Sequence, residues 1–107
     1  MKLKLGAKKR LILLNIVAGV RGNLTELRIL REVKEALSFS EGEHAALKIQ
    51  ERNGRLHWDT KADEPKEIEI GEVAKHIIVR RFKELNKQGQ LAQDHLDIVD
   101  LFPEVEE

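Results

Sequence analysis

The sequence Lys-Leu-Lys-Leu-Gly at residues 2–6 returns at residues 67–71 as Glu-Ile-Glu-Ile-Gly, with the charges reversed. In both segments a charged residue alternates with an aliphatic one, and a period of two is typical of a strand with one buried face. Paired as neighbours, the strands place the aliphatic side chains on one face and bring the lysines against the glutamates on the other. We therefore predict a two-stranded ribbon of residues 2–5 with 67–70.

Three helices are expected between these strands. Residues 7–18 are apolar on almost every side, which indicates a helix that is either central to the fold or half of an interface. Asn23 with Glu26, and Ser40 with Glu43, match the capping box that begins a helix. The first box opens an amphipathic helix, and the second opens a short helix that reaches about residue 48. The apolar face expected for the amphipathic helix is Leu27, Leu30, Val33 and Leu37.

The second half of the chain starts with a turn at Asn53-Gly54, since both residues accept positive φ and so predict a short polar hairpin at 48–59. A long amphipathic helix at 72–87 and a last helix near 92–101 follow the second strand. Pro103 ends the last helix, and the acidic tail at 103–107 is expected to be frayed. The expected apolar face of the long helix is Val73, Ala74, Ile77, Ile78, Phe82 and Leu85.

The pattern as a whole predicts an α+β, mainly helical fold with four or five helices in a single compact domain of 107 residues. Charged residues make up 36% of the chain, but 19 basic residues balance 19 acidic ones, which removes the broad attraction expected of a non-specific nucleic-acid binder. The chain has no cysteine, so disulfides and thiolate metal sites are excluded. A cytoplasmic protein is expected.

An apolar run at residues 11–20 has about half the length of a membrane span. It continues into Arg21, Gly22 and a helix cap instead of the cleavage site of a secretory signal. We interpret the run as a buried helix and expect no membrane association.

A basic stripe on the long helix is the best candidate partner-binding surface. His76, Arg80, Lys83 and Lys87 follow the spacing i, i+4, i+7, i+11 and so share one face. This stripe suits an acidic partner or a phosphate, but the sequence favours the simpler explanation that it is solvated or pairs with Asp94, Asp97 and Asp100 of the last helix.

Arg81 falls within the apolar face of the same helix. An unpaired buried guanidinium is very costly. Arg81 must therefore extend to the edge of the face, form an internal ion pair, or be exposed where a partner docks. We add it to the candidate partner-binding residues.

Phosphate contacts are the alternative use of the basic residues. Lys8, Lys9 and Arg10 form a basic segment, and Arg52 and Arg55 flank the hairpin turn. The order of helices and hairpin over residues 7–59 fits a winged-helix protein. The element in the recognition position is acidic at its N-terminal end, however, where base contacts are usually made. The first ten residues are basic and the last fourteen are acidic, so the two ends of the sequence are expected either to attract each other or to be solvated.

Catalysis has little support in the sequence. The four histidines have no metal-site spacing, both serines lie at helix boundaries, and no glycine-rich phosphate loop is present. We therefore expect no enzyme and predict no catalytic, metal-binding or cofactor-binding residues.

Two stretches resemble a group of small proteins encoded by phages and prophages. One is Leu-Thr-Glu-Leu-Arg-Ile-Leu-Arg-Glu-Val-Lys-Glu-Ala-Leu-Ser-Phe-Ser-Glu at 24–41. The other combines Lys-Glu-Ile-Glu-Ile at 66–70 with Gly-Gln-Leu-Ala-Gln-Asp-His-Leu at 89–96. The shared motifs are structural, and the group has no catalytic residues to carry over. The resemblance implies a virus-derived protein that acts through binding.

The function expected from the sequence is a non-enzymatic protein–protein interaction or assembly module, which binds a protein partner or a second copy of itself. A nucleic-acid-binding accessory protein with winged-helix-like elements is the alternative. The charged segment at residues 60–66 is either a connector or a docking loop, and the sequence does not decide between them.

Overall fold

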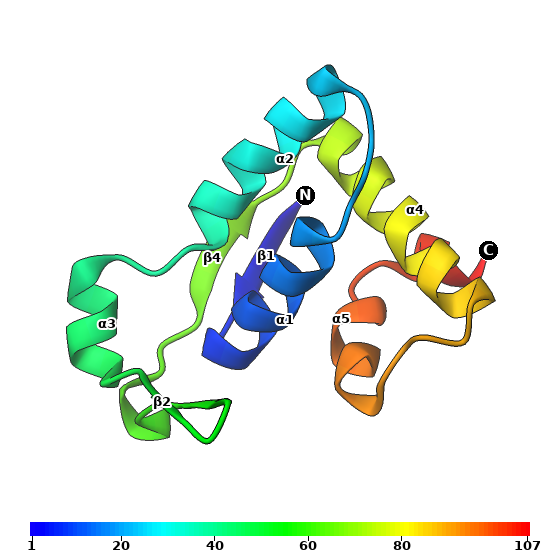
Figure 1. Cartoon of the computed structure of the whole chain (residues 1–107). Coiled ribbons are helices and arrows are strands. Elements are labelled where there is room, and N and C mark those ends of the chain that lie inside the picture. Colours follow the sequence, from blue (N-terminus) through cyan, green and yellow to red (C-terminus); the bar gives the residue numbers. More distant parts are fainter.

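The computed structural model describes residues 1–107 and has the expected α+β architecture with five α-helices and two small antiparallel sheets (Figure 1). The elements are, in chain order, β1 (Lys2–Leu5), α1 (Ala7–Ala18), α2 (Leu24–Leu37), α3 (Glu41–Leu47), β2 (Gln50–Arg52), β3 (Arg55–His57), the 3₁₀ helix η1 (Thr60–Ala62), β4 (Lys66–Glu69), α4 (Glu72–Lys87), η2 (Gln93–His95), α5 (Leu96–Val99) and η3 (Pro103–Glu106).

The predicted ribbon is confirmed as an antiparallel pair of β1 and β4. Leu3 lies opposite Ile68, and the second strand begins one residue earlier than predicted. The Ile70 N–H donates to the Met1 carbonyl at 2.7 Å, which extends the pairing by one step. The aliphatic side chains of this face, including Leu5 with no exposed surface, join the hydrophobic core.

Helix α1 lies at the centre of the molecule, where it contacts β1, α2, α4 and α5. Leu13, Ile16 and Val17 are buried in the core, and Ile12 and Leu14 pack against its edge. Because neighbours cover several sides of α1, its nearly uniform apolar surface is explained by this central position.

Helix α2 begins with the predicted capping box. Asn23 Oδ1 accepts from the Glu26 N–H at 2.9 Å, and Glu26 Oε1 accepts from the Asn23 N–H at 3.2 Å. Leu27, which was expected on the apolar face of this helix, is 41% exposed. The buried face is centred on Leu30, Val33 and Leu37, and position 27 lies on the flank of that face.

Helix α4 has the predicted bounds but a slightly different buried face. Val73 was expected on the apolar face and is 56% exposed, whereas Val79 is buried. Because α4 packs against α1 and α2 and also against η3, its buried arc extends round to Val79 and leaves Val73 outside it.

The C-terminal region differs from the prediction in two ways. The last helix is divided into η2 and α5. The tail expected to be frayed instead forms η3 and packs against α4. Val105 is buried in the core, and Glu104 forms an ion pair with Lys75 at 2.7 Å. The buried side chain of Val105 and the ion pair of Glu104 therefore hold the tail against α4.

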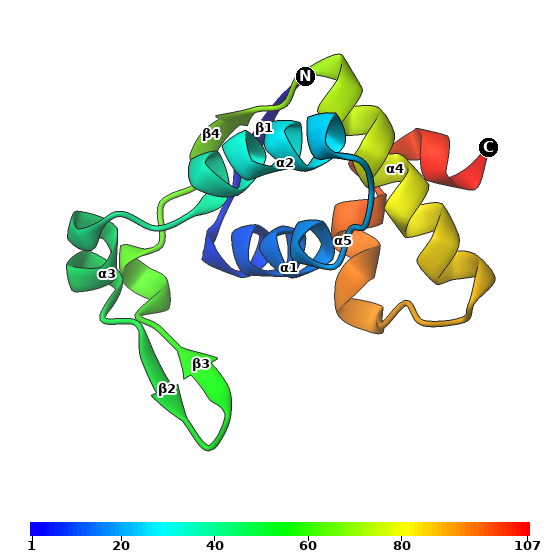
Figure 2. The ribbon, with the colours of Figure 1, turned by 45° about the horizontal axis from the view of Figure 1, so that its top comes forward.

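The α3 helix, the β2–β3 hairpin and η1 form one end of the molecule, away from α4 and α5 (Figures 1 and 2). The hairpin turns at Asn53-Gly54 as predicted, with both φ angles positive, and every residue of its strands is exposed. None of the helices combines the length and the apolar character needed to cross a membrane.

Candidate functional site

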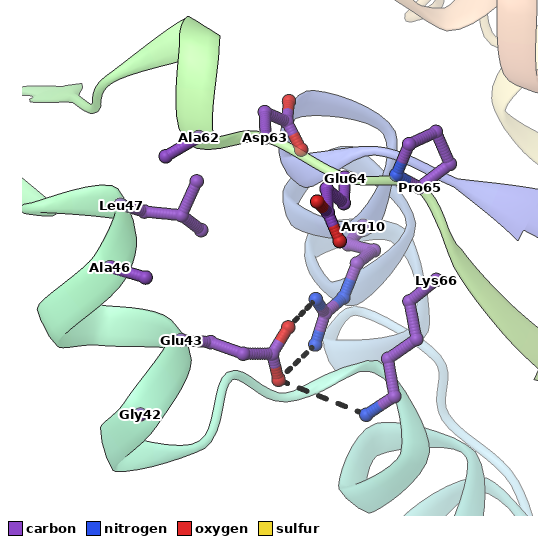
Figure 3. Close-up of a pocket in the computed structure, with 10 residues that line it drawn as sticks. All are labelled: Arg10, Gly42, Glu43, Ala46, Leu47, Ala62, Asp63, Glu64, Pro65 and Lys66. Atoms are coloured by element: carbon purple, nitrogen blue, oxygen red, sulfur yellow. Dashed lines mark hydrogen bonds and ion pairs between the residues drawn. The ribbon is translucent and has the colours of Figure 1, made fainter.

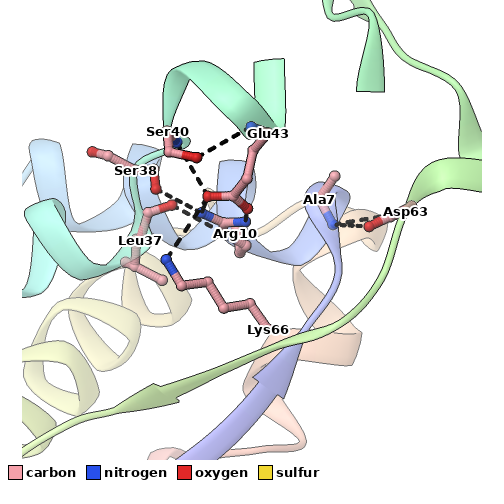
Figure 4. Close-up of polar contacts among 8 residues, drawn as sticks. All are labelled: Ala7, Arg10, Leu37, Ser38, Ser40, Glu43, Asp63 and Lys66. Carbon is pink, nitrogen blue, oxygen red and sulfur yellow. Dashed lines mark hydrogen bonds and ion pairs between the residues drawn. The ribbon is translucent and has the colours of Figure 1, made fainter. Parts of the chain in front are cut away.

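Arg10 lies in a buried polar centre between α1 and α3, with only 2% of the residue exposed (Figure 4). Its Nε donates to the Leu37 carbonyl at 3.1 Å, and its Nη2 donates to the Ser38 carbonyl at 2.6 Å. The guanidinium pairs with the Glu43 carboxylate and stacks over the Phe39 ring at 3.9 Å from the centroid. Arg10 is therefore not free to contact phosphate, contrary to the sequence-based prediction.

A hollow of about 350 Å³ lies beside this centre, between α3 and the segment that joins η1 to β4 (Figure 3). The hydrogen bond from Arg10, together with the Ser40 N–H and the Lys66 ammonium, lowers the pKa of Glu43 from 4.5 to about 2. Glu43 consequently has no proton to donate near neutral pH. The carboxylate beside the hollow is therefore part of a structural ion pair, and it is poorly suited to acid–base chemistry.

Asp63 caps the N-terminus of α1 from 56 residues away. Its two carboxylate oxygens accept from the Ala7 N–H at 2.9 and 3.2 Å, where the N-cap residue Gly6 has no side chain to do so (Figure 4). A Cβ at position 6 would lie 3.3 Å from Asp63 Oδ2, so the close approach suits glycine. The segment at 60–66, which the sequence left open, is therefore fastened to the body of the protein.

The basic stripe His76, Arg80, Lys83 and Lys87 is exposed along α4 and borders an open depression of about 380 Å³. Arg80 Nη1 pairs with Glu26 Oε2 of α2 at 2.8 Å, and this hydrogen bond is the main cause of the lowered pKa of Glu26. The other three stripe residues make no ion pair. The acidic residues of the last helix form no ion pairs with the stripe. Asp94 pairs with Lys8 instead, and Asp97 and Asp100 make no ion pair.

Arg81 forms the internal ion pair that was one of its predicted alternatives, with Nη1 at 3.4 Å from Glu84 Oε2. Its guanidinium covers the C-terminal end of α1, where a Cβ on Gly19 would lie only 2.9 Å from Nη2. A cation at this end of a helix is favoured by the helix dipole. Arg81 therefore helps to pack α4 against the C-terminal end of α1.

The predicted phosphate contacts are not brought together on one surface. Lys8 and Lys9 share a hollow of about 260 Å³ with the carboxylates Asp63, Asp94 and Asp97. Arg52 and Arg55 lie opposite each other in the hairpin, and Arg52 donates to Gln50 Oε1 at 2.9 Å. Of these residues, the hairpin arginines alone are exposed without a carboxylate partner.

The four histidines lie on four different elements, α3, β3, α4 and η2. His44 packs edge-on against Phe39. His95 Nδ1 accepts from the N–H of Ala92 at 2.9 Å, at a helix start where the residue Ala92 has no polar side chain of its own. No group of three or more histidine, aspartate or glutamate side chains converges in a way that could hold a metal ion.

A larger hollow, of about 490 Å³, lies between the C-terminal end of α1 and the first turns of α2. We call it the α1–α2 groove. Leu24 is 69% exposed and Leu27 is 41% exposed at its mouth, and Val20 is half-buried. The residues that form the groove are Val17, Val20, Leu24, Leu27, Arg28, Leu30, Arg31 and Lys34.

The cations of this groove have no partner within the protein. Arg28, Arg31 and Lys34 are exposed, and their side chains make no ion pair or hydrogen bond. Sequence reasoning missed the groove because Leu27 was grouped with the apolar face of the helix, and nothing separated it from the residues that are buried there. The pattern Leu24-x-x-Leu27-Arg28-x-x-Arg31 was visible, but the amphipathic period of α2 alone does not say which leucine the neighbouring helix covers.

Comparison with known proteins gives this chain no family. No family model matches the sequence, and no curated protein or solved structure is significantly similar to it. The candidate sites therefore stand on their own geometry. Among them, the α1–α2 groove brings two exposed leucines, Leu24 and Leu27, together with cations that have no partner.

Proposed function

We propose that this protein is a non-enzymatic protein–protein interaction module that binds through the α1–α2 groove. The observation that carries the proposal is the exposure of Leu24 and Leu27 above an apolar floor, beside three cations without partners. Exposed apolar side chains rimmed by polar ones mark interaction surfaces. The other exposed large apolar residues, such as Leu56 and Leu96, lie on separate elements.

The groove has the physical character of a docking site for an amphipathic segment. Covering a leucine side chain contributes roughly 1.5–3 kcal/mol when the burial is complete. A groove between two helices accepts the apolar face of a third helix, with anchors at helical spacing. The free cations Arg28, Arg31 and Lys34 favour an acidic partner and accelerate its encounter with the protein.

The stripe on α4 is the weaker of the two candidate surfaces. Arg80 and Arg81 already have partners within the protein, and Val79 beneath the stripe is buried. Lys83 and Lys87 remain free, so the stripe offers charge with little apolar surface to cover. This makes the pair Lys83 and Lys87 a matched control for the groove.

The test is an affinity capture from cell lysate with three forms of the tagged protein: wild type, Arg28→Glu/Arg31→Glu, and Lys83→Glu/Lys87→Glu. Both double variants change the net charge by the same amount. We expect mass spectrometry to identify a protein partner that the groove variant loses and the stripe variant keeps, with nuclease having no effect. Equal retention by both variants, or loss of the partner on nuclease treatment, would contradict the proposal.

A nucleic-acid-binding accessory protein remains the second candidate, and one observation favours it. Arg52 and Arg55 face each other on a hairpin that projects from the body of the molecule, as a wing does (Figure 2). Each phosphate contact contributes about 0.9 to the slope of log affinity against log salt. If the hairpin grips a duplex, Arg52→Glu/Arg55→Glu should lower this slope by about two. An unchanged slope would reject this role for the hairpin.

The proposal includes the setting that the sequence suggests, a phage-derived protein acting in the cytoplasm. The stretch at residues 24–41 supports the phage origin by its resemblance, and it contains α2, which forms one wall of the groove. The absence of cysteine is compatible with a reducing compartment.

A further inference from the structure

We propose that the occupant of the α1–α2 groove is a second copy of this chain, which docks through the exposed acidic surface around Val73, on the other flank of α2. This inference rests on the proposed function and deepens it by naming the partner. It is carried by the charges around two apolar hollows that the same helix separates.

The second hollow measures about 390 Å³ and lies between α2, the end of β4 and the start of α4. We call it the acidic hollow. Val73 is 56% exposed at its edge, and Glu32, Glu69 and Glu72 are exposed around it without ion pairs. The residues that form it are Ile29, Glu32, Val33, Glu69, Gly71, Glu72, Val73 and Ala74.

The groove and the acidic hollow match in character and are opposite in sign. Each has exposed apolar surface, Leu24 and Leu27 at the groove and Val73 at the hollow, and each has three charged side chains that form no ion pair within the chain. Leu27, Arg31 and Lys34 lie on one flank of α2 and Ile29 lies on the other, while Arg28 and Glu32, one turn apart, lie along the boundary between the two surfaces. The two surfaces therefore cannot meet within one molecule, but they can meet between two.

A contact between two different patches is heterologous, so each copy keeps one free groove or one free hollow unless the assembly closes into a ring. The net charge of zero leaves no overall repulsion between copies. A standard interface covers about 800 Å² of each partner. This is roughly a tenth of the 7412 Å² surface of the protein.

The experiment is sedimentation velocity over a concentration series, with the protein itself as the probe. The groove variant is Arg28→Glu/Arg31→Glu, and the hollow variant is Glu32→Lys/Glu72→Lys. Each variant alone presents like charges on both surfaces, so we expect its self-association to weaken at least about tenfold, equivalent to 1.4 kcal/mol. An equimolar mixture presents opposite charges at every contact, and we expect it to restore association to the level of the wild type.

The mixture is its own control for folding, because restored association requires both variants to be folded. Circular dichroism melting of each variant verifies this independently, and Lys83→Glu/Lys87→Glu should associate like the wild type. A wild-type protein that stays monomeric across the series overturns the inference, as does a mixture of folded variants that fails to associate. If the lysate capture still yields a different partner that depends on the groove, the proposed function stands while the second copy is rejected.

Discussion

The Arg10 centre and the α1–α2 groove both place arginines beside apolar side chains. In the Arg10 centre the guanidinium is buried and paired, whereas in the groove the guanidinium groups are exposed and unpaired. Arg10 is 2% exposed and is held by the Glu43 carboxylate, two backbone carbonyls and the Phe39 ring. Arg28 and Arg31 are exposed and have no partner at all.

This difference follows from the cost of removing a charge from water. A buried guanidinium must be paired and hydrogen-bonded, so its interactions are committed to the fold. An exposed guanidinium remains solvated and loses little by having no partner, so it stays available for another molecule. We therefore expect substitutions at the Arg10 centre to change stability and substitutions in the groove to change binding.

The largest expected effect tests this contrast directly. Arg10→Ala leaves two carbonyls without their donor and leaves the Glu43 carboxylate with only the Ser40 N–H and Lys66 as partners, and breaking a buried pair costs about 3–5 kcal/mol. Arg28→Ala should change the free energy of unfolding by no more than about 0.5 kcal/mol. Urea denaturation of both variants measures the difference. Similar small losses at the two sites would show that the Arg10 centre is not a stabilising contact.

The second prediction concerns pH and the Glu43 carboxylate. The folded pKa of about 2 lies below the unfolded value of 4.5, so its stabilisation is complete above about pH 4.5 and is lost as the pH falls towards 2. At neutral pH it amounts to at most about 3 kcal/mol. We expect Glu43→Gln to be less stable than the wild type at neutral pH and the gap to close in acid. Thermal melts from pH 7 to 2 measure the gap, with Glu41→Gln as the control. A gap that stays constant with pH would contradict the assignment.

Asp63 provides a test of smaller expected effect, because its side chain also stabilises the fold through hydrogen bonds to a distant segment. Asp63→Ala removes the only side-chain acceptor seen for the Ala7 N–H, and loss of a helix N-cap typically costs about 1 kcal/mol and up to about 2. Glu64→Ala is the matched control, because Glu64 is exposed and has no ion pair. Denaturant midpoints of the two variants should differ by this amount, and coincident midpoints would remove Asp63 from its role as the cap.

Much of the fold could be predicted because its signals are local. Asn23 and Ser40 begin their helices through contacts three residues away, and the turn at Asn53-Gly54 needs only its own backbone angles. The ribbon joins distant segments, but its alternating pattern of opposite charge fixed both its face and its partner.

The contacts that escaped prediction depend on how the elements pack. The Arg10–Glu43 pair spans 33 residues, and the Asp63 cap spans 56. Nothing in the sequence near Arg10 distinguishes it from Lys8 and Lys9, which stay at the surface or close to it. The exposure of Leu27 and Val73 escaped prediction for the same reason: the helical period gives an apolar face, whereas the neighbouring helices decide which of its residues are buried.

The smallest expected effect lies in the ribbon, where charges are exposed and paired at once. Lys2 Nζ lies 3.7 Å from Glu67 Oε1, with more than half of each side chain exposed, so the pair contributes at most about 1 kcal/mol. Lys2→Glu/Lys4→Glu should lower the denaturation midpoint slightly, because each new glutamate then faces another across the strands. Adding Glu67→Lys and Glu69→Lys should restore part of the loss, and the loss should shrink in high salt. If the fourfold variant shows no recovery, the ribbon is held by its buried face alone. Its exposed charges would then belong with those of the α1–α2 groove, free for a partner.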